Sequence, residues 1–262
     1  MKHFFVLGNE TSKSLSPIIF NHWFKKYKIK AKYTFLEVKK KRNLNKALLN
    51  KLKEKNICGY NITMPYKKDV FAYLDKKNTH SNKIGAVNCV VVKKKSTGIN
   101  TDWIGYLRSI RGFGINKNKK ILVLGYGGAS MAIVYGFLSK GYKDIVVLNR
   151  SKKQINFNGL KTYTKKYSCL GEHLSNADLI INTTPTNQIK KKQSKMVKKT
   201  TVVSDIVYKP KETSFLKQFP KNKKVYGISM LVEQAVPSFK AWFGFWPVVD
   251  QELLNKLDKK IK

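Results

Sequence analysis

The stretch Lys120–Ser130, KILVLGYGGAS, decides the fold of this chain. Its apolar first half predicts a buried strand, its glycines a tight turn, and the residues up to Lys140 a helix. Glycines at such a turn let the backbone approach a pyrophosphate that rests on the helix N-terminus. A second predicted strand, Asp144–Leu148, follows at the expected distance. The stretch therefore predicts a dinucleotide-binding α/β unit.

The residues after the second strand indicate which dinucleotide is bound. An NAD enzyme usually presents Asp or Glu there to the ribose 2′-hydroxyl. This chain continues Asn149-Arg150-Ser151 instead, and a guanidinium suits a 2′-phosphate. The position is informative because arginine is otherwise confined to Arg42, Arg108 and Arg111. We therefore expect NADP.

Strands and helices alternate along the whole chain, which predicts α/β layers with parallel strands. The expected strands are His3–Gly8, Tyr33–Val38, Cys58–Thr63, Ile84–Val92, Ala177–Asn182, Thr201–Ser204 and Lys223–Tyr226. The expected helices include Ile18–Tyr27, Leu44–Lys53, Ser229–Trp242 and a terminal helix over Val248–Ile261. No internal repeat or long linker interrupts this order.

The turn Asn61–Lys67, NITMPYK, is the first candidate for chemistry. Pro65 suits the first turn of a helix, which places Lys67 in that same turn. The helix dipole is positive there, and desolvation also disfavours an ammonium, so such a lysine can exchange a proton with a substrate. The competing interpretation is a solvated charge, the usual role of a lysine.

Three further polar positions have both a structural and a functional interpretation. Ser14 and Ser16 precede Pro17, so they either cap a helix or bind a carboxylate at its N-terminus. Asn88 lies in the middle of a predicted strand and is either satisfied by backbone groups or holds a ligand hydroxyl. Asp102 opens a helix as an N-cap or is the acidic partner of Lys67.

The bulk composition indicates a folded protein with an unusual charge. The chain has 262 residues, 53 basic and 15 acidic side chains, and a net charge of +38. Such a surplus suggests a nucleic-acid partner. The basic residues are nearly all lysines, however, spread along the chain together with many asparagines and isoleucines, which favours the codon bias of an AT-rich genome.

Cysteines, histidines and hydropathy indicate no metal site, disulfide framework or membrane segment. Cys58, Cys89 and Cys169 are odd in number and form no CxxC pair, and the four histidines lack metal-ligand spacing. No apolar run has the length of a signal-peptide core or a membrane span. We expect a cytoplasmic protein.

Several motifs, taken in order, resemble the shikimate dehydrogenase family. They are Ser14-Leu-Ser16-Pro17, Asn61-x-Thr63-x-Pro65-x-Lys67, Gly85-Ala-Val-Asn88, Asn100-Thr101-Asp102, Gly125-x-Gly127-Gly128-Ala129, Asn149-Arg150, Asn182-Thr-Thr-Pro185, Asp205-x-x-Tyr208-x-Pro210 and Met230-Leu231-x-x-Gln234. The resemblance covers essentially the whole chain. It implies NADPH-dependent, reversible reduction of 3-dehydroshikimate to shikimate, on the route to chorismate and the aromatic amino acids.

The resemblance also implies an organisation and a set of site residues. A substrate-binding catalytic domain would span 1–101, with 237–262 packing back on it, and a Rossmann-like NADP domain would span 102–236 across a cleft. Lys67 and Asp102 would be the catalytic pair. Substrate would also contact Ser14, Ser16, Thr63, Asn88, Tyr208 and Gln234. The cofactor would contact Gly125, Tyr126, Gly127, Gly128, Ala129, Asn149, Arg150, Ser151, Lys152, Lys153, Gln154, Ile206 and Gly227.

Four residues depart from the family pattern: Phe20, Cys89, Tyr126 and Ser229. We expect Phe20 to affect packing and the ring of Tyr126 to point outward. The alternatives are a quinate/shikimate dehydrogenase with relaxed NAD(P) use, and a non-catalytic nucleic-acid-binding protein on the same fold. The expected assembly is a monomer or homodimer.

Overall fold

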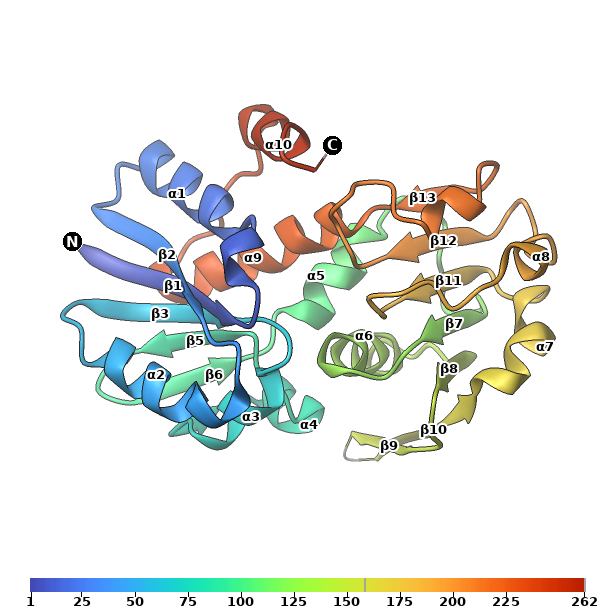
Figure 1. The fold of residues 1–262 in the computed structure, drawn as a ribbon, viewed down its shortest axis with the longest axis horizontal. Coiled ribbons are helices and arrows are strands. Elements are labelled where there is room, and N and C mark those ends of the chain that lie inside the picture. The colour runs from blue at the N-terminus through green and yellow to red at the C-terminus, as the bar shows by residue number, and fades with distance from the viewer. Residues whose placement is uncertain (158, 262) are drawn as a thin grey trace. The chain divides into compact units, whose positions relative to one another are not determined.

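The computed structural model describes residues 1–157 and 159–261. It separates into two compact units, each with its own sheet (Figure 1). Unit 1 comprises Met1–Thr101 and Gln234–Lys259, and unit 2 comprises Asp102–Glu233 with Lys260 and Ile261. Helices accompany the strands in both units, which confirms the predicted α/β class.

Unit 1 has a six-stranded sheet in the part of the chain that the structure describes. Its strands are β1 (Lys2–Gly8), β2 (Ala31–Glu37), β3 (Ile57–Ile62), β4 (Lys76–Lys77), β5 (Cys89–Val92) and β6 (Ser96–Ile99). The order is β2-β1-β3-β5-β6-β4. Strands β1, β2 and β3 are parallel, whereas β5 is antiparallel to both β3 and β6.

The helices of unit 1 come from both ends of the chain. They are α1 (Ser16–Lys26), α2 (Leu44–Leu52), α3 (Lys67–Ala72), α4 (Thr79–Ile84), the last ten residues of α9 (Gly227–Phe243) and α10 (Gln251–Asp258), with short 3-10 turns η1 (Thr11–Lys13) and η2 (Lys41–Asn43). Alternate residues of β1 enter two apolar layers. Phe4 packs on Trp242 of α9, whereas Phe5 stacks on Tyr60 in the layer that includes α2.

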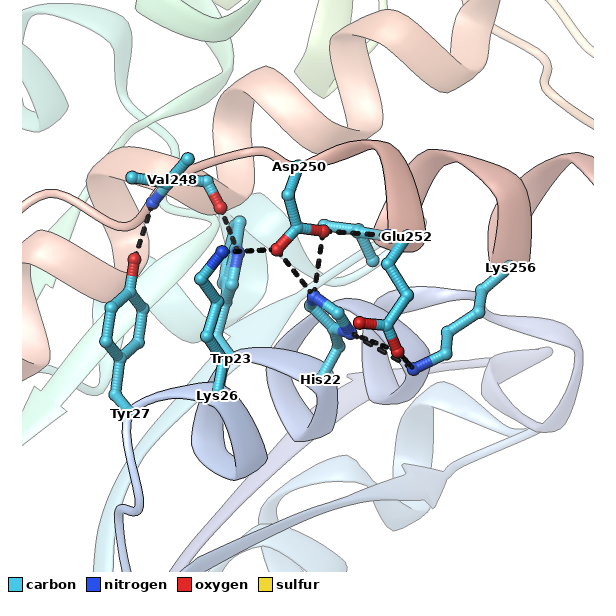
Figure 2. A network of polar contacts seen from close by, with 9 residues as sticks. His22, Trp23, Lys26, Tyr27, Val248, Asp250, Glu252 and Lys256 are labelled. Atoms are coloured by element: carbon cyan, nitrogen blue, oxygen red, sulfur yellow. Dashed lines mark hydrogen bonds and ion pairs between the residues drawn. The ribbon is translucent and has the colours of Figure 1, made fainter.

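Polar contacts attach α10 to α1. His22 Nε2 lies 3.0 Å from Asp250 Oδ1, Lys26 Nζ lies 2.5 Å from Asp250 Oδ2, and Lys256 Nζ lies 3.2 Å from His22 Nδ1 (Figure 2). The lysine can only donate, so Nδ1 accepts and the Nε2 proton of His22 points at the carboxylate. Asp250 also accepts the backbone N–H of Leu253 and thereby caps α10.

Unit 2 has a seven-stranded sheet in the described residues, in the order β13-β12-β11-β7-β8-β10-β9. The strands are β7 (Ile121–Leu124), β8 (Ile145–Asn149), β9 (Gln154–Phe157), β10 (Leu160–Lys166), β11 (Leu179–Asn182), β12 (Val202–Asp205) and β13 (Lys224–Val225). The helical segments are α5 (Asp102–Ser109), α6 (Gly128–Ser139), η3 (Tyr167–Cys169), α7 (Leu170–Leu174), α8 (Lys191–Ser194), η4 (Leu216–Gln218) and the start of α9. Among these described strands, only β9 runs antiparallel to its neighbour.

Three expectations about these elements were wrong. The segment Ile84–Val92 is not one strand: Ile84 ends α4, and β5 begins only at Cys89, so Asn88 precedes the strand. The strands are not all parallel, because β5 and β9 reverse direction. The terminal helix spans only Gln251–Asp258, and its start is fixed by Asp250, which caps it. Within the described residues, no helix is long and apolar enough to cross a membrane.

Candidate functional site

Lys67 is the first residue of α3, at the end of the turn that follows β3. The turn is fixed by backbone bonds from Thr63 N–H to Leu7 O and from Tyr66 N–H to Thr63 O. The buried Tyr66 hydroxyl donates to Val38 O at 2.5 Å and so ties the turn to the end of β2. Pro65 lies in the turn before the helix, so its expected place within the helix was wrong, but Lys67 is in the first helical turn as predicted.

The serines lie at the start of α1, but not as predicted. Ser16 is the first helical residue and not the N-cap. Ser14 Oγ accepts the backbone N–H of Ser16 at 3.2 Å. The same loop is fixed by Ser12, whose N–H and hydroxyl both donate to Glu37 Oε2, and these bonds lower the pKa of Glu37. Because Ser14 Oγ accepts, its hydroxyl proton is left to donate to an anion.

Asn88 belongs to a buried hydrogen-bond network with two other side chains. Its Oδ1 accepts the N–H of Thr101 at 2.6 Å, and its Nδ2 donates to Thr101 Oγ1 at 2.8 Å and to Gln234 Oε1 at 3.1 Å. The structural interpretation of Asn88 therefore holds in part, although side chains contribute as well as backbone. Two predicted substrate residues, Asn88 and Gln234, are brought into direct contact.

A second polar group extends this network and was not predicted. Asn61 donates to Ser238 Oγ at 3.2 Å and accepts the hydroxyl of Tyr33 at 2.8 Å. Ser238 Oγ in turn lies 3.1 Å from Thr101 Oγ1. Burial raises the pKa of Tyr33 well above its usual value, so Tyr33 remains a neutral donor. Polar side chains within the otherwise apolar β3 and α9 were the signal available in the sequence.

Two of the residues that depart from the family pattern line this network. Phe20 is buried and stacks on Tyr33 with ring centroids 4.6 Å apart, which confirms its packing role. Cys89 is also buried, and desolvation raises the pKa of its thiol to about 12 although a hydrogen bond with Ser238 opposes the shift. The thiol is therefore neutral and takes the place of a small apolar side chain.

The remaining predicted substrate residues, Asp102 and Tyr208, lie in unit 2. Asp102 is buried and is the first residue of α5, directly after Thr101. Tyr208 is half-buried and follows β12. Pairing of Asp102 with Lys67, which is in unit 1, stays a prediction.

The glycine turn connects β7 to α6 in unit 2. Gly125 has φ +94°, and a Cβ there would lie 2.6 Å from Thr184 Cγ2, so the position requires glycine. Ser130 Oγ donates to Gly125 O at 2.7 Å and closes the turn. Gly127 is exposed, with open space where a Cβ would be, as a backbone that receives a ligand needs. Tyr126 is half-buried, and desolvation raises the pKa of its hydroxyl to about 12; an outward direction of its ring stays a prediction.

The segment after β8 presents the predicted 2′-phosphate residues. Arg150, Ser151, Lys152, Lys153 and Gln154 are exposed, and Asn149 is half-buried. Asn149 Nδ2 donates to Ser151 O at 3.1 Å. Gln154 begins β9, which the sequence did not predict. Cationic side chains without a carboxylate form a donor set that fits a phosphomonoester.

The ends of β11 and β12 position the last two cofactor residues. Asp205 accepts from Asn182 Nδ2 at 3.2 Å and from Thr213 Oγ1 at 2.6 Å, and burial nonetheless raises its pKa. Ile206 N–H donates to Asn182 O. A Cβ on Gly227 would lie 2.6 Å from Ile206 O, so these two residues are in close contact. The described residues contain no group of three His, Cys, Asp or Glu side chains that could hold a metal ion.

Comparison with known proteins identifies the family. The model described as "Shikimate dehydrogenase substrate binding domain" matches residues 6–90, and the model described as "Shikimate / quinate 5-dehydrogenase" matches residues 110–215. A shikimate dehydrogenase (NADP(+)) of Bartonella quintana is 33% identical over 97% of this chain and 92% of its own length. The chain belongs to the shikimate dehydrogenase family.

Solved structures of family members share the fold over the full length. The shikimate dehydrogenase of Aquifex aeolicus has a TM-score of 0.81 at 29% identity and covers 98% of this chain and 97% of its own. The shikimate 5-dehydrogenase of Thermus thermophilus, solved with NADP(H) and shikimate, has a TM-score of 0.79 at 26% identity, covering 100% of both chains. The dinucleotide-binding unit predicted from Lys120–Ser130 is thus confirmed as a Rossmann-like unit of this family.

Proposed function

We propose that this chain is an NADP-dependent shikimate dehydrogenase that reversibly reduces 3-dehydroshikimate to shikimate in the biosynthesis of chorismate and aromatic amino acids. The observation that carries the proposal is the full-length similarity to proteins named shikimate dehydrogenase (NADP(+)). Two local features support it: a lysine at the first position of α3, and Arg150 in place of an acidic residue after β8.

Substrate recognition is assigned to polar residues of both units. Ser14 and Ser16 bind the substrate carboxylate, and the Ser14 hydroxyl can donate because its oxygen already accepts the N–H of Ser16. Asn88 and Gln234 contact the ring substituents or the carboxylate. Hydrogen bonds with Thr101 fix Asn88, which in turn donates to Gln234. Thr63 and Tyr208 complete the set. The organisation follows the family: 1–101 with 237–262 for substrate, and 102–236 for cofactor.

The catalytic roles belong to Lys67 and Asp102. When bound, NADPH supplies the hydride that reduces the substrate carbonyl. Lys67 donates a proton to the carbonyl oxygen and stabilises the negative charge that develops there. Asp102 orients the lysine and a substrate hydroxyl.

The cofactor residues of the proposal lie at the carboxyl ends of β7, β8 and β12 and at the start of α9. The backbone of Gly125–Ala129 binds the pyrophosphate at the N-terminus of α6. The residues of 149–154 surround the 2′-phosphate, with Arg150 as its main partner. Ile206 and Gly227 line the nicotinamide.

The decisive test measures NADPH oxidation by the purified protein with 3-dehydroshikimate. We expect rapid turnover that Lys67→Ala reduces by about 10²–10⁴-fold in kcat, as removal of a general acid does. Lys68→Ala is the matched control, since it removes the same charge from the next residue, and it should keep near-normal activity. A Lys67→Ala enzyme with normal kcat would remove the lysine from the mechanism.

The same assay separates the family's second activity. One of the matching models is described as shikimate / quinate 5-dehydrogenase, so quinate and NAD are run beside shikimate and NADP in the oxidation direction. We expect shikimate with NADP to give the larger kcat/KM. Faster turnover of quinate with NAD would keep the fold and change both substrate and cofactor.

Cellular context completes the proposal. We place the protein in the cytoplasm as a monomer or homodimer without a nucleic-acid partner. The thiols of Cys58, Cys89 and Cys169 are all free, as suits a reducing compartment. Light scattering coupled to gel filtration would determine the assembly, and fractionation of the source cells the location.

A further inference from the structure

A buried threonine forms hydrogen bonds to the segment that the proposed function assigns to binding of the 2′-phosphate. Thr164 lies in β10, next to Val147 of β8, and its side chain is fully buried. Its hydroxyl donates to Ser151 O at 3.0 Å and accepts the N–H of Lys153 at 2.8 Å. Its backbone N–H also donates to Lys153 O at 2.9 Å. One residue therefore makes three hydrogen bonds to an exposed turn up to 13 residues away in sequence.

These bonds determine which way the turn presents its donors. Ser151 O receives two hydrogen bonds, from Thr164 Oγ1 and from Asn149 Nδ2. The C=O and N–H of a trans peptide point in opposite directions, so the N–H of Lys152 is directed away from Thr164. The exposed Arg150 and Lys152 flank this inward carbonyl. The hydrogen bonds to Ser151 O thus fix the backbone between two cationic side chains.

We infer that the Thr164 hydroxyl is a positioning group that holds Asn149–Lys153 in the conformation that selects a 2′-phosphate, and that it thereby sets the preference for NADP over NAD. The inference rests on the proposed cofactor site. Because Thr164 is buried, we assign it a positioning role that acts on the cofactor through the turn. A turn that is already ordered loses less conformational entropy when the nucleotide binds than a flexible turn would.

The test compares Thr164→Val, which keeps the shape and loses the hydroxyl, with Thr164→Ser, which keeps the hydroxyl. We expect Thr164→Val to raise the KM for NADPH about tenfold, the effect of losing one or two hydrogen bonds. KM for NADH and kcat should change less than about twofold, and Thr164→Ser should restore the NADPH value. Thr162→Val is the matched control, because Thr162 lies two residues earlier on β10 and pairs with Ile155.

A binding measurement keeps the inference separate from the dehydrogenase activity. Calorimetric titration with 2′,5′-ADP and with 5′-AMP needs no turnover, so it reads the 2′-phosphate site even if no substrate is reduced. We expect Thr164→Val to weaken 2′,5′-ADP alone. Equal losses for both nucleotides, or for NADPH and NADH, would overturn the inference, as would a wild-type protein that does not prefer 2′,5′-ADP. If Thr164→Val does not fold, Thr164→Ala is measured in its place with the same expectations.

Discussion

A side chain at position 227 would collide with backbone atoms of the loop after β12. A Cβ on Gly227 would lie 2.5 Å from Val207 O and 2.6 Å from Ile206 O, and main-chain atoms cannot rotate aside as a side chain can. We expect Gly227→Ala to lower the free energy of unfolding by about 1–3 kcal/mol, as overpacking does, and to raise the KM for NADPH because Ile206 must move. Urea denaturation and initial rates measure the two effects.

The control for this substitution is another helical glycine of unit 2. Gly171 of α7 has nothing within 4 Å of a built Cβ. Gly171→Ala should therefore be neutral or stabilising by up to about 1 kcal/mol, since alanine favours a helix. Similar decreases in the free energy of unfolding from both substitutions would show that the close contact at Gly227 is not the cause of the effect.

At the same scale, the sequence predicted the residues that act by their own chemical type. Lys67, Arg150 and the glycines of 125–128 could be identified because a helix start or a strand end nearby determines their surroundings. Ser238 and Thr164 could not, because each acts through partners that only the fold supplies. Ser238 meets Thr101 across 137 residues, so its polar side chain in an apolar part of α9 is visible in the sequence but its partner is not.

At the scale of an element, polar side chains determine how α10 is attached to α1. Asp250 fixes the start of this short helix through its contacts with His22 and Lys26 (Figure 2). It also accepts the backbone N–H of Leu253. Burial opposes the charge of Asp250, but hydrogen bonds from Lys26, Leu253 and His22 outweigh it and hold the pKa well below its usual value.

Asp250 should therefore make stability depend on pH. A carboxyl with a depressed pKa in the folded state contributes stability above its unfolded pKa, here 3.8, and that contribution is lost as the pH falls. We expect Asp250→Asn, which still caps α10, to cost about 1–3 kcal/mol at neutral pH. The difference from wild type should shrink below about pH 4, as urea midpoints measured between about pH 3 and 7 would show.

The control removes a charge from the same helix at an exposed site. Glu252 pairs with Lys256 at 2.7 Å, but 69% of its side chain is exposed. Glu252→Gln should have a much smaller effect, because solvent screens such pairs. A pH-independent deficit in Asp250→Asn would mean that shape, and not charge, attaches the helix.

The sequence predicted helices and strands correctly where a short apolar run or a regular spacing of apolar residues marks the element. Strands β1, β7, β11 and β12 follow from short apolar runs, and α1 from its helical spacing. The pair β9–β10 was not predicted, because Gln154–Phe157 and Leu160–Lys166 interrupt their apolar residues with lysine, threonine and asparagine. The expected strand over Ile84–Val92 was wrong at its start. The apolar residues just after Gly85 resemble those of β5 in type, so composition did not show that the strand begins only at Cys89.

At the scale of the whole molecule, the charge of +38 must influence every encounter with an anion. Both proposed ligands, 3-dehydroshikimate and NADPH, are anionic, so a positive field raises their rate of capture. We expect KM for NADPH to rise several-fold between about 0.05 and 0.5 M NaCl while kcat changes little, since salt shortens the range of the field. Replacing NaCl with sucrose of equal osmolality is the control.

The same field predicts weak binding to any polyanion, which separates surplus charge from a nucleic-acid function. Arginine forks are scarce, so RNA would bind through dispersed lysines and should dissociate as salt approaches about 0.2 M, because each phosphate contact depends on counterion release. Fluorescence anisotropy with a labelled single-stranded RNA would follow this, beside the dehydrogenase assay in the same buffers. Dehydrogenase activity that persists after the RNA is released would show that the positive charge reflects amino-acid composition and not a nucleic-acid function. RNA that stays bound in physiological salt would instead require a surface that recognises it.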